Sequence, residues 1–249
     1  MFYTNEIIGN RAVFSPETSA HIVKVLRHKA GDKISFTDGT GMLYEGSLIN
    51  ADPKRAETSI TNIKQTKTTL PPIHIVVAPT KNIDRIEWFV EKAVEVGIAE
   101  ISFVQTKNSE RKTLKIDRLH KIAESAMLQS KQTYMPKINE MISLKRFIER
   151  ITHLHCDKFF GYCYEGNIYS TSETRPEEIL YYPEMINRNV PTMVLIGPEG
   201  DFTIEEAQYL QNNNFLPVVL SSTRLRTETA ALFAGWIYAT KSSKFCLEY

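Results

Sequence analysis

The stretch VLIGPEGDFTI, residues 194–204, places an apolar run directly before Gly-Pro-Glu-Gly and a predicted helix start. The run is typical of a parallel strand that is buried on both faces. The two glycines allow close backbone approach and positive φ, and the proline fixes φ between them. Such a loop at the carboxyl end of a strand presents backbone N–H and C=O groups to a ligand, which suits a nucleoside or an amino acid. The alternative is a tight turn in which Thr203 caps the helix and Glu206 completes a capping box.

A second stretch, LPVVLSSTRLRTETAALFAGW (216–236), repeats the order of strand, polar turn and helix. Two strand ends of this kind can form the two walls of one pocket. An arginine is electrostatically unfavourable beside the positive N-terminus of a helix that Thr227 can cap. Arg226 is therefore predicted to act on an anion or a polarised oxygen. The alternative is a surface ion pair of Arg226 with Glu199 or Glu228.

Strands and helices alternate on both sides of these loops. Apolar strands are predicted at 73–79, 101–105, 158–163, 192–198 and 216–222, and helices at 82–97, 115–132, 204–212 and 228–241. This alternation is typical of an α/β domain with a mainly parallel sheet.

The first seventy residues follow another pattern. Short alternating runs such as DKISFTDG and MLYEGSLI are separated by turn sequences rich in Gly and Asp, as in a small antiparallel barrel or sheet. One helix is predicted to begin at Ser15-Pro16-Glu17 and to stop at Gly31. The segment QTKTTLPPI predicts a domain boundary near Leu70, so that residues 1–70 form one domain and 71–249 another.

Composition narrows the protein class. With 42% hydrophobic and 24% charged residues, the chain reads as an ordinary globular protein. No apolar stretch approaches the roughly 20 residues that span a bilayer, and the start lacks the pattern of a secretory signal. The three cysteines form no CxxC pair, so neither a disulfide framework nor a zinc knuckle is favoured, and we expect a cytoplasmic protein.

The charge is unevenly distributed, although its net value is only +1. Residues 107–150 contain eleven Lys or Arg against five Asp or Glu, whereas 151–206 contain three against ten. This contrast suggests a polyanionic partner on one face, and the alternative is two solvated surfaces. Lys24 and Arg27, on the predicted first helix, can contact phosphates or be part of a solvated face.

Several site classes find no support in the sequence. No GxGxxG follows a strand, and neither GxxxxGK[ST] nor GxSxG occurs, so Rossmann, P-loop and common hydrolase sites are unsupported. His153, His155 and Cys156 lie close together, but no second cluster has matching spacing, and no metal site is predicted.

Six segments together resemble one family. HIVKVLRHKAGD, KNIDRIEWFVEKAVEVGIAEI, SERK, ESAMLQSKQTYMPKI, LIGPEGDFTIEE and LRTETAALFA are similar, in this order, to the bacterial ribosomal RNA small subunit methyltransferase E family. That family methylates N3 of a uridine in small-subunit ribosomal RNA. The resemblance implies an N-terminal PUA-like β-barrel, a C-terminal SPOUT-type α/β domain with a trefoil knot, S-adenosylmethionine bound in the knot, and a homodimer.

The resemblance also assigns site residues. The residues expected to bind the cofactor, largely through their backbone, are Leu195, Ile196, Gly197, Pro198, Glu199, Gly200, Leu220, Ser221, Ser222, Thr223 and Leu225. The residues expected to bind RNA are Lys24, Arg27, Lys81, Arg85, Arg111 and Lys112. Arg226 is the expected catalytic residue.

The expected role of Arg226 follows from the chemistry of uracil. N3 must lose its proton before it has a lone pair for attack on a methyl group, and the charge spreads onto the flanking carbonyl oxygens. A guanidinium can stabilise that charge. Glu199 or Glu228 could orient Arg226 or accept the proton, and the sequence does not choose between them.

Three positions depart from the family. Asp201 stands where the family usually has a second glycine, and Ser221 stands where it usually has glycine after the strand-ending leucine. The run Thr223-Arg224-Leu225-Arg226 replaces the more common Arg-Ile-Leu-Arg. Serine fits at position 221 if the φ of that residue stays negative.

These departures leave other readings open. One is a non-catalytic RNA-binding homologue, and another is a methyltransferase of the same fold that acts on another RNA, such as a tRNA. A nucleotide-binding metabolic enzyme would leave the N-terminal domain and the basic segment unexplained.

Overall fold

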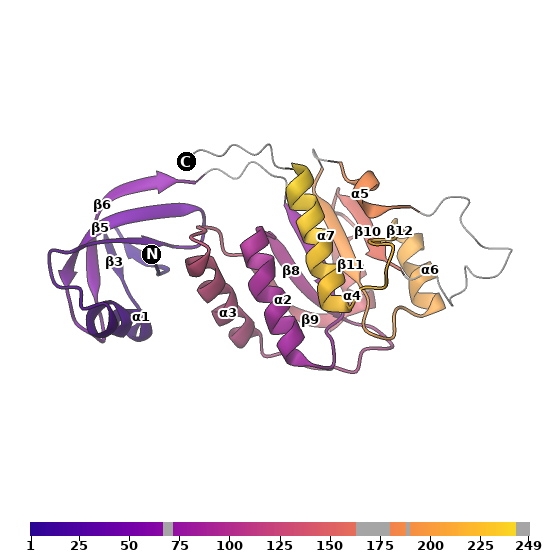
Figure 1. Ribbon diagram of the computed structural model, residues 1–249, viewed down its shortest axis with the longest axis horizontal. Helices are drawn as coiled ribbons and strands as arrows, with labels where there is room; N and C mark the ends of the chain where they lie inside the picture. Colours follow the sequence, from indigo (N-terminus) through magenta and orange to yellow (C-terminus); the bar gives the residue numbers. More distant parts are fainter. Residues whose placement is uncertain (67–71, 163–179, 188–189, 243–249) are drawn as a thin grey trace. The chain divides into compact units, whose positions relative to one another are not determined.

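The computed structural model describes residues 1–66, 72–162, 180–187 and 190–242 (Figure 1). The chain forms two units, each described here by itself. The first consists of Met1–Thr68 with Glu124–Met135, and the second of Thr69–Ala123 with Pro136–Tyr249. The boundary predicted near Leu70 lies outside the described residues. Among the described helices, none has the length and apolar character needed to cross a membrane.

The first unit contains a curled six-stranded sheet. Its strands are β1 (Phe2–Tyr3), β2 (Glu6–Ile8), β3 (Arg11–Val13), β4 (Lys33–Thr37), β5 (Met42–Asn50) and β6 (Glu57–Gln65), in the order β1-β4-β5-β6-β3-β2. All neighbours are antiparallel except β1 and β4. The Thr4 hydroxyl donates to the carbonyl of Val13, and the rings of Phe2 and Phe14 lie 6.2 Å apart. These contacts bring the two sides of the sheet together around an apolar core.

A short helical segment covers this core. Ser15 caps α1 (Pro16–Ala20) by accepting the N–H of Thr18, and the chain continues as the π-helix η1 (His21–Val25). Arg27 then takes a left-handed conformation with φ of 59°, and the N–H of His28 donates to the carbonyl of Ile22 at 3.1 Å. The helix thus ends in a left-handed cap before Gly31, where its end was expected. Arg27 belongs to this cap and not to a helix face shared with Lys24.

The segment Glu124–Met135 is part of the first unit through backbone pairing. The N–H of Gly41 donates to Thr133 and the N–H of Met135 to Gly39, both at 2.8 Å. A side chain at Gly41 would overlap the ring of Tyr134, and its φ of 95° also requires glycine. The pairing of these two segments therefore depends on a glycine in the turn before β5.

The second unit contains a six-stranded parallel sheet, as predicted. Its strands are β7 (Ile73–Val77), β8 (Glu100–Gln105), β9 (Lys137–Ser143), β10 (Asp157–Gly161), β11 (Thr192–Ile196) and β12 (Leu216–Val218), in the order β12-β10-β11-β7-β8-β9. The edge strand β9 was not predicted from the sequence, because its alternating polar residues lack the continuous apolar run that marks the inner strands.

The described helices are α2 (Ile83–Val96), α3 (Ile116–Gln129), α4 (Leu144–Ile151), α5 (Tyr182–Met185), α6 (Ile204–Asn212) and α7 (Thr227–Ser242). Asn82 caps α2 and Gly97 ends it in the left-handed conformation, as the sequence predicts. The capping box of Thr203 and Glu206 is also present at α6. Helix α4 was missed, although it has a serine cap and apolar residues at helical spacing.

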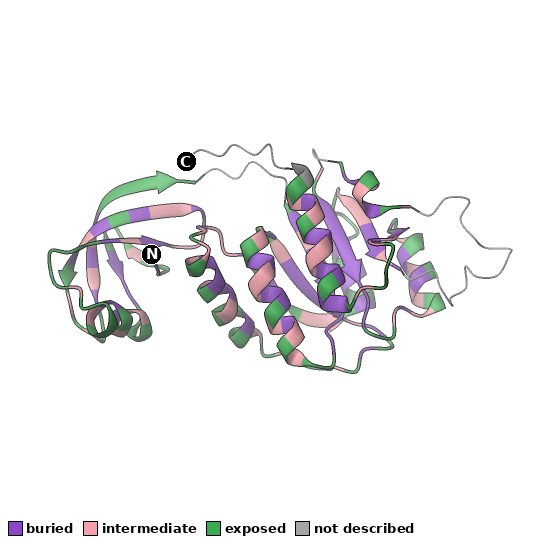
Figure 2. Cartoon of the chain, in the orientation of Figure 1, coloured by how far each residue is buried: buried purple, intermediate pink, exposed green. Residues whose placement is uncertain are grey.

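The helices lie on both faces of this sheet. Helices α2 and α7 pack together, with α7 against β7 and β11, while α4 packs against β8 and β9 and contributes to a core cluster with α6 (Figures 1 and 2). Alternate residues of β7 serve the two faces: Val76 joins the α4 and α6 cluster, and Ile75 faces Gly235 of α7. Strands β10, β11 and β7 therefore have both faces covered, which explains their apolar sequences.

A polar network crosses the sheet beneath α4. His74 Nε2 lies 2.8 Å from the hydroxyl of Ser102, which also accepts the Asn139 amide at 2.8 Å. The imidazole is 13% exposed and contacts the ring of Phe147 edge-on. Burial lowers the pKa of His74 to about 4, although the Glu100 carboxylate at 3.9 Å favours the charged form. His74 is therefore held neutral in the folded chain.

This neutral histidine predicts a loss of stability on mild acidification. In the unfolded chain the pKa of a histidine is about 6.5, so the unfolded state binds the extra proton between about pH 6.5 and 4. The contribution of neutral His74 to the free energy of unfolding is complete above this pH window and is lost as the pH falls through it. Because attraction to Glu100 offsets part of the cost, we expect a loss on the order of 1–3 kcal/mol.

Urea unfolding at pH 7 and pH 5 measures this loss. His74→Gln, which keeps a donor for Ser102, should show a smaller difference between the two pH values than the wild type. His120→Gln is the matched control, because His120 is exposed on α3. Equal pH dependence in the wild type and in His74→Gln would contradict the assignment.

Candidate active site

The loop after β11 is a tight turn held from both sides. The N–H of Asp201 donates to the carbonyl of Pro198 at 3.0 Å, and the Asn108 amide donates to the carbonyls of Gly200 and Asp201 at 2.9 and 3.0 Å. A Cβ at Gly200 would lie 3.2 Å from Cβ of Asn108, which is tighter than an ordinary contact. The turn and Asn108 are thus packed closely around a glycine.

Asp201 has a φ of 56°, in the left-handed region. A glycine adopts this region without strain, and aspartate is one of the side chains that tolerates it best. Its Oδ1 accepts the N–H of Phe202 at 2.8 Å. The replacement of the family's second glycine by Asp201 is therefore compatible with this turn.

The loop after β12 leaves backbone groups open. Ser221 is not among the residues with positive φ, so serine fits there, and its hydroxyl accepts the N–H of Thr223 at 3.3 Å. Within the described residues, the N–H groups of Ser222, Arg224 and Leu225 donate to no protein group. The loop therefore has backbone donors that are available to a ligand.

The two loops meet over the end of the strand that separates them in the sheet. The buried hydroxyl of Thr227 donates to the carbonyl of Gly197 at 2.9 Å. A Cβ at Gly161, the last residue of β10, would lie 3.1 Å from Ile196 and 3.3 Å from Leu220. The predicted cofactor residues of the two loops are thus brought together, with buried apolar side chains beneath them.

A carboxylate on each side of this junction faces the same arginine of α2. Arg85 Nη1 lies 4.0 Å from Glu199 Oε1, and Arg85 Nε lies 3.7 Å from Glu228 Oε1. Glu199 Oε1 also accepts the N–H of Lys81 at 3.1 Å. Glu228 is only 6% exposed, and its Oε2 has no hydrogen-bond partner within the described residues.

Arg226 lies beside this network without joining it. Its side chain is exposed, and in the described part of the chain no ion pair links it to Glu199 or Glu228. The surface ion pair considered for Arg226 is therefore absent there. Arg226 lines a pocket of about 290 Å³ together with Asp84, Arg85, Trp88, Glu228 and Thr229.

The side chains expected to bind RNA fall into two groups. Lys24, Arg27 and Lys112 are exposed and make no ion pair within the described residues. Lys81 Nζ pairs with Glu110 at 2.8 Å, and this hydrogen bond raises the pKa of Lys81. Lys81 is thus less available to a phosphate than the other two lysines.

Two of the expected RNA-binding residues have structural contacts that the sequence did not indicate. Arg111 donates to the carbonyls of Thr80 and Lys81, with Nε 3.0 Å from the first. It therefore holds the loop between β7 and α2. Arg85 pairs with the two carboxylates described above, although its side chain is 35% exposed.

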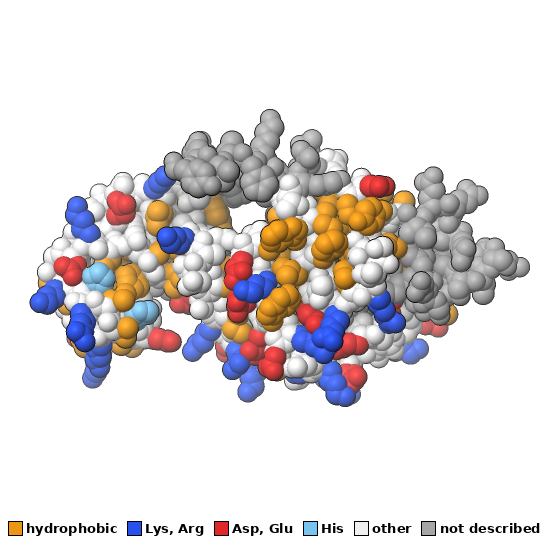
Figure 3. Space-filling model, viewed as in Figure 1, with side chains coloured by type: hydrophobic (Ala, Val, Ile, Leu, Met, Phe, Trp, Pro, Cys, Tyr) orange, Lys and Arg blue, Asp and Glu red, His pale blue; other side chains and the backbone are white. Residues whose placement is uncertain are grey.

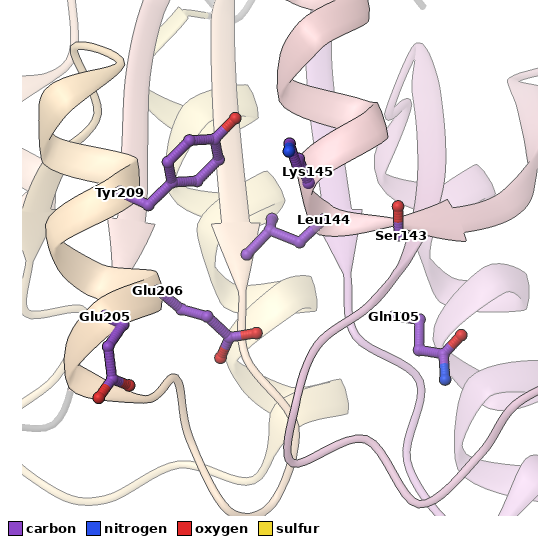
Figure 4. Close-up of a pocket in the computed structure, with 7 residues that line it drawn as sticks. All are labelled: Gln105, Ser143, Leu144, Lys145, Glu205, Glu206 and Tyr209. Carbon is purple, nitrogen blue, oxygen red and sulfur yellow. The ribbon is translucent and has the colours of Figure 1, made fainter.

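A second pocket lies on the other face of the same sheet. It has a volume of about 340 Å³ and is lined by Gln105, Ser143, Leu144, Lys145, Glu205, Glu206 and Tyr209 (Figure 4). The carboxylate of Glu206 is already engaged, because it accepts the N–H groups of Thr203 and Lys107 at 3.0 and 2.8 Å. The described residues contain no group of His, Cys, Asp or Glu side chains that could hold a metal ion, and this includes His153, His155 and Cys156.

Sequence reasoning missed three features of this site. It treated Thr227 as a helix cap, whereas the hydroxyl bonds to the other loop. It did not indicate the pairing of Arg85 with Glu199 and Glu228, and it did not include Trp88, which is 42% exposed beside the pocket. The signal available for Arg85 and Trp88 was their spacing of three on α2, which puts them on one face.

Comparison with known proteins identifies related chains. Residues 67–238 match the model of a family described as the RNA methyltransferase domain, and residues 14–61 match an RNA methyltransferase PUA domain. The ribosomal RNA small subunit methyltransferase E 1 of Borreliella burgdorferi is 28% identical over 230 residues, which are 89% of each chain.

Two solved structures have the same fold. A probable rRNA-methyltransferase from Porphyromonas gingivalis is 33% identical with a TM-score of 0.83, covering 95% of this chain and 96% of that one. A ribosomal RNA small subunit methyltransferase E from Neisseria gonorrhoeae, bound to S-adenosyl methionine, is 23% identical with a TM-score of 0.78 and 96% coverage of both chains. This second likeness supports the fold alone.

Proposed function

The chain belongs to the RNA methyltransferase family, and from this membership we propose that it methylates N3 of a uridine in small-subunit (16S) ribosomal RNA, with S-adenosylmethionine as methyl donor. The relatives named for small-subunit rRNA methylation support the substrate. The observation that carries the site is the hydrogen bond from Thr227 to Gly197, which joins the two loops expected to hold the donor.

The residues of the two loops fit S-adenosylmethionine. Free backbone N–H groups at Ser222, Arg224 and Leu225 can bind the polar atoms of an adenosine or a methionine. Gly197 and Gly200 allow the turn to pack closely against Phe202 and Asn108. When bound, the cofactor supplies an electrophilic sulfonium methyl group.

Arg226 is proposed as the catalytic residue. Its guanidinium is exposed and unpaired in the described part of the chain, so it is available to the acceptor base. It would stabilise the negative charge that develops on the uracil carbonyl oxygens once N3 loses its proton. The binding of Arg85 to both carboxylates leaves Arg226 free for this role.

RNA capture is proposed for exposed cations of both units. Lys24 and Arg27 of the first unit and Lys112 of the second are the available candidates, with smaller contributions from Lys81, Arg85 and Arg111. Each phosphate contact should steepen the salt dependence of binding. We propose that the target base leaves its stack to reach the donor, which costs a few kcal/mol.

We also propose that the protein forms a homodimer and that its second unit contains a trefoil knot. We propose that it acts in the cytoplasm. Hydrophobic side chains gather over α2 and α7 (Figure 3), where Trp236 of α7 is 56% exposed. A second copy is the partner that the resemblance implies for this face. The knot is proposed from the resemblance alone.

Nucleoside mass spectrometry of a deletion strain tests the proposed function. Loss of 3-methyluridine from small-subunit rRNA, restored by the wild-type gene, is the expected result. A change confined to tRNA nucleosides would instead assign another RNA substrate. Failure of the purified chain to bind S-adenosylmethionine would favour a non-catalytic RNA-binding homologue.

A further inference from the structure

We infer that the pocket at the start of α2 and α7 receives the acceptor uracil, and that the Glu228 carboxylate takes the proton of N3. This inference rests on the proposed function and adds to it a base-recognition pocket and a proton acceptor. The pocket of about 290 Å³ lies directly beside the junction of the two loops.

The carboxylate of Glu228 is buried with half of its hydrogen-bonding capacity unused. The residue is 6% exposed, and its Oε2 has no partner within the described residues. A buried charged oxygen without a partner is costly in a folded protein, so its retention in a pocket points to a ligand that supplies a donor. Uracil supplies such a donor at N3.

Two arginines and two further carboxylates surround Glu228. Arg85 of α2 lies 3.7 Å from its other oxygen, and Arg226 lines the same pocket. The remaining charged groups that face it are Asp84 of α2 and Glu199 of the β11–α6 loop, which shares Arg85. Arg85 and Arg226 are thus the cations near three carboxylates, Glu228, Asp84 and Glu199.

The same groups match the edge of a uracil base. Uracil presents an N–H donor at N3 between two carbonyl oxygens. Glu228 can accept from N3, and the guanidinium groups of Arg85 and Arg226, which line the same pocket, can donate to the carbonyl oxygens. Trp88, which is 42% exposed at the pocket, provides an aromatic face on which a base can stack. Cytosine has a lone pair at N3, which a carboxylate repels.

Glu199 is the less suitable acceptor. Its side chain is 40% exposed, and its Oε1 already accepts the N–H of Lys81 while lying 4.0 Å from Arg85. It does not line the pocket. Glu199 is therefore assigned the positioning of Arg85, and the choice left open by the sequence falls on Glu228.

The proposed step balances without another reactant. The N3–H bond breaks, and its proton forms an O–H bond with Glu228 Oε2. The electron pair left on N3 forms the bond to the methyl carbon, while the methyl–sulfur bond breaks and its electron pair stays on sulfur. The neutral carboxylic acid later releases the proton to water.

Binding measurements test base recognition without turnover. The fluorescence of Trp88 can be measured in a Trp236→Phe background with S-adenosylhomocysteine present. Oligouridylate should quench it, and the concentration needed should be at least tenfold lower than for oligocytidylate. Glu228→Gln should abolish this preference, because an amide can accept from uracil or donate to cytosine. A wild-type chain without the preference, including one that binds neither oligonucleotide, would overturn the inference.

Single-turnover methylation of small subunits from a deletion strain tests the proton transfer. Glu228→Gln should be at least a hundredfold slower at neutral pH, and its remaining rate should rise about tenfold per pH unit, because hydroxide must then remove the proton. The wild-type rate should change little over the same range. A variant with wild-type rate would exclude Glu228 as the acceptor.

Arg85→Met is the matched control for a positioning role. It removes the ion pair of Glu228 but keeps the carboxylate, so the rate should fall without gaining the tenfold dependence on pH. If both variants respond to pH alike, Glu228 acts only by holding Arg85, and the inference fails. Calorimetric binding of S-adenosylmethionine and melting temperatures show whether each variant is folded. If the wild-type chain methylates another nucleoside, the proposed function fails separately from this inference.

Discussion

Arg226→Ala is expected to lower the rate of methyl transfer by a factor of about 100 to 1,000 while S-adenosylmethionine binding stays nearly unchanged. Loss of one preorganised donor that stabilises developing negative charge typically has an effect of this size. The side chain is exposed beside the pocket and makes no ion pair with Glu199 or Glu228 in the described part of the chain, so its removal breaks no such contact of the fold. Single-turnover kinetics and calorimetry measure the two quantities.

Arg224→Ala is the matched control for this prediction. Arg224 is an exposed arginine of the same loop that does not line the pocket, so a change of only a few fold is expected. Equal losses in both variants would mean that the loop acts through its general positive charge. A loss of cofactor affinity in Arg226→Ala would move this residue from catalysis to binding.

Thr227→Val is expected to destabilise the second unit by about 1–3 kcal/mol and to weaken S-adenosylmethionine binding by about tenfold. Valine has nearly the shape of threonine but cannot donate to the carbonyl of Gly197, which would be left without this partner. Leaving a buried acceptor unsatisfied has a cost of this order. The two loops would also lose the hydrogen bond that fixes their separation.

Urea unfolding and calorimetry test this prediction, with Thr240→Val as the control. Thr240→Val makes the same substitution at an exposed position of α7, where the hydroxyl donates to the carbonyl of Trp236 at 3.0 Å, and little change is expected. If Thr227→Val keeps wild-type stability and affinity, the link between the loops does not organise the site.

The strands and helices of the second unit could be predicted because local patterns and packing agree there. Continuous apolar runs marked β7, β8 and β11, and caps marked the ends of α2 and α6. The edge strand β9 and the short helix α4 were missed. Neither has the long periodic pattern on which such predictions depend.

The site was predicted in outline but not in its contacts. Two glycine- or serine-bearing turns at strand ends indicated a common pocket, because parallel strands end at one edge of a sheet. The pairing of Arg85 with Glu199 and Glu228 joins residues more than a hundred positions apart. The burial of Glu228 likewise depends on tertiary packing, which no local pattern reports.

In the first unit, the prediction of the fold from the sequence was limited in another way. Its strands and the capped start of α1 follow from alternation and from Ser15-Pro16, but the left-handed Arg27 ended the helix early. The assignment of Glu124–Met135 to this unit was not foreseen, since that segment is separated from the N-terminal sheet by three elements of the other unit.

That assignment has a consequence for how the protein is made. Because Thr133 and Met135 complete the turn at Gly39 and Gly41, the N-terminal part cannot reach its final form on the ribosome until residue 135 has emerged from the exit tunnel. By then β7, α2 and β8 have already been synthesised. The first unit can therefore be completed only after part of the second has been made, and neither unit can be excised or exchanged as a single uninterrupted stretch of chain.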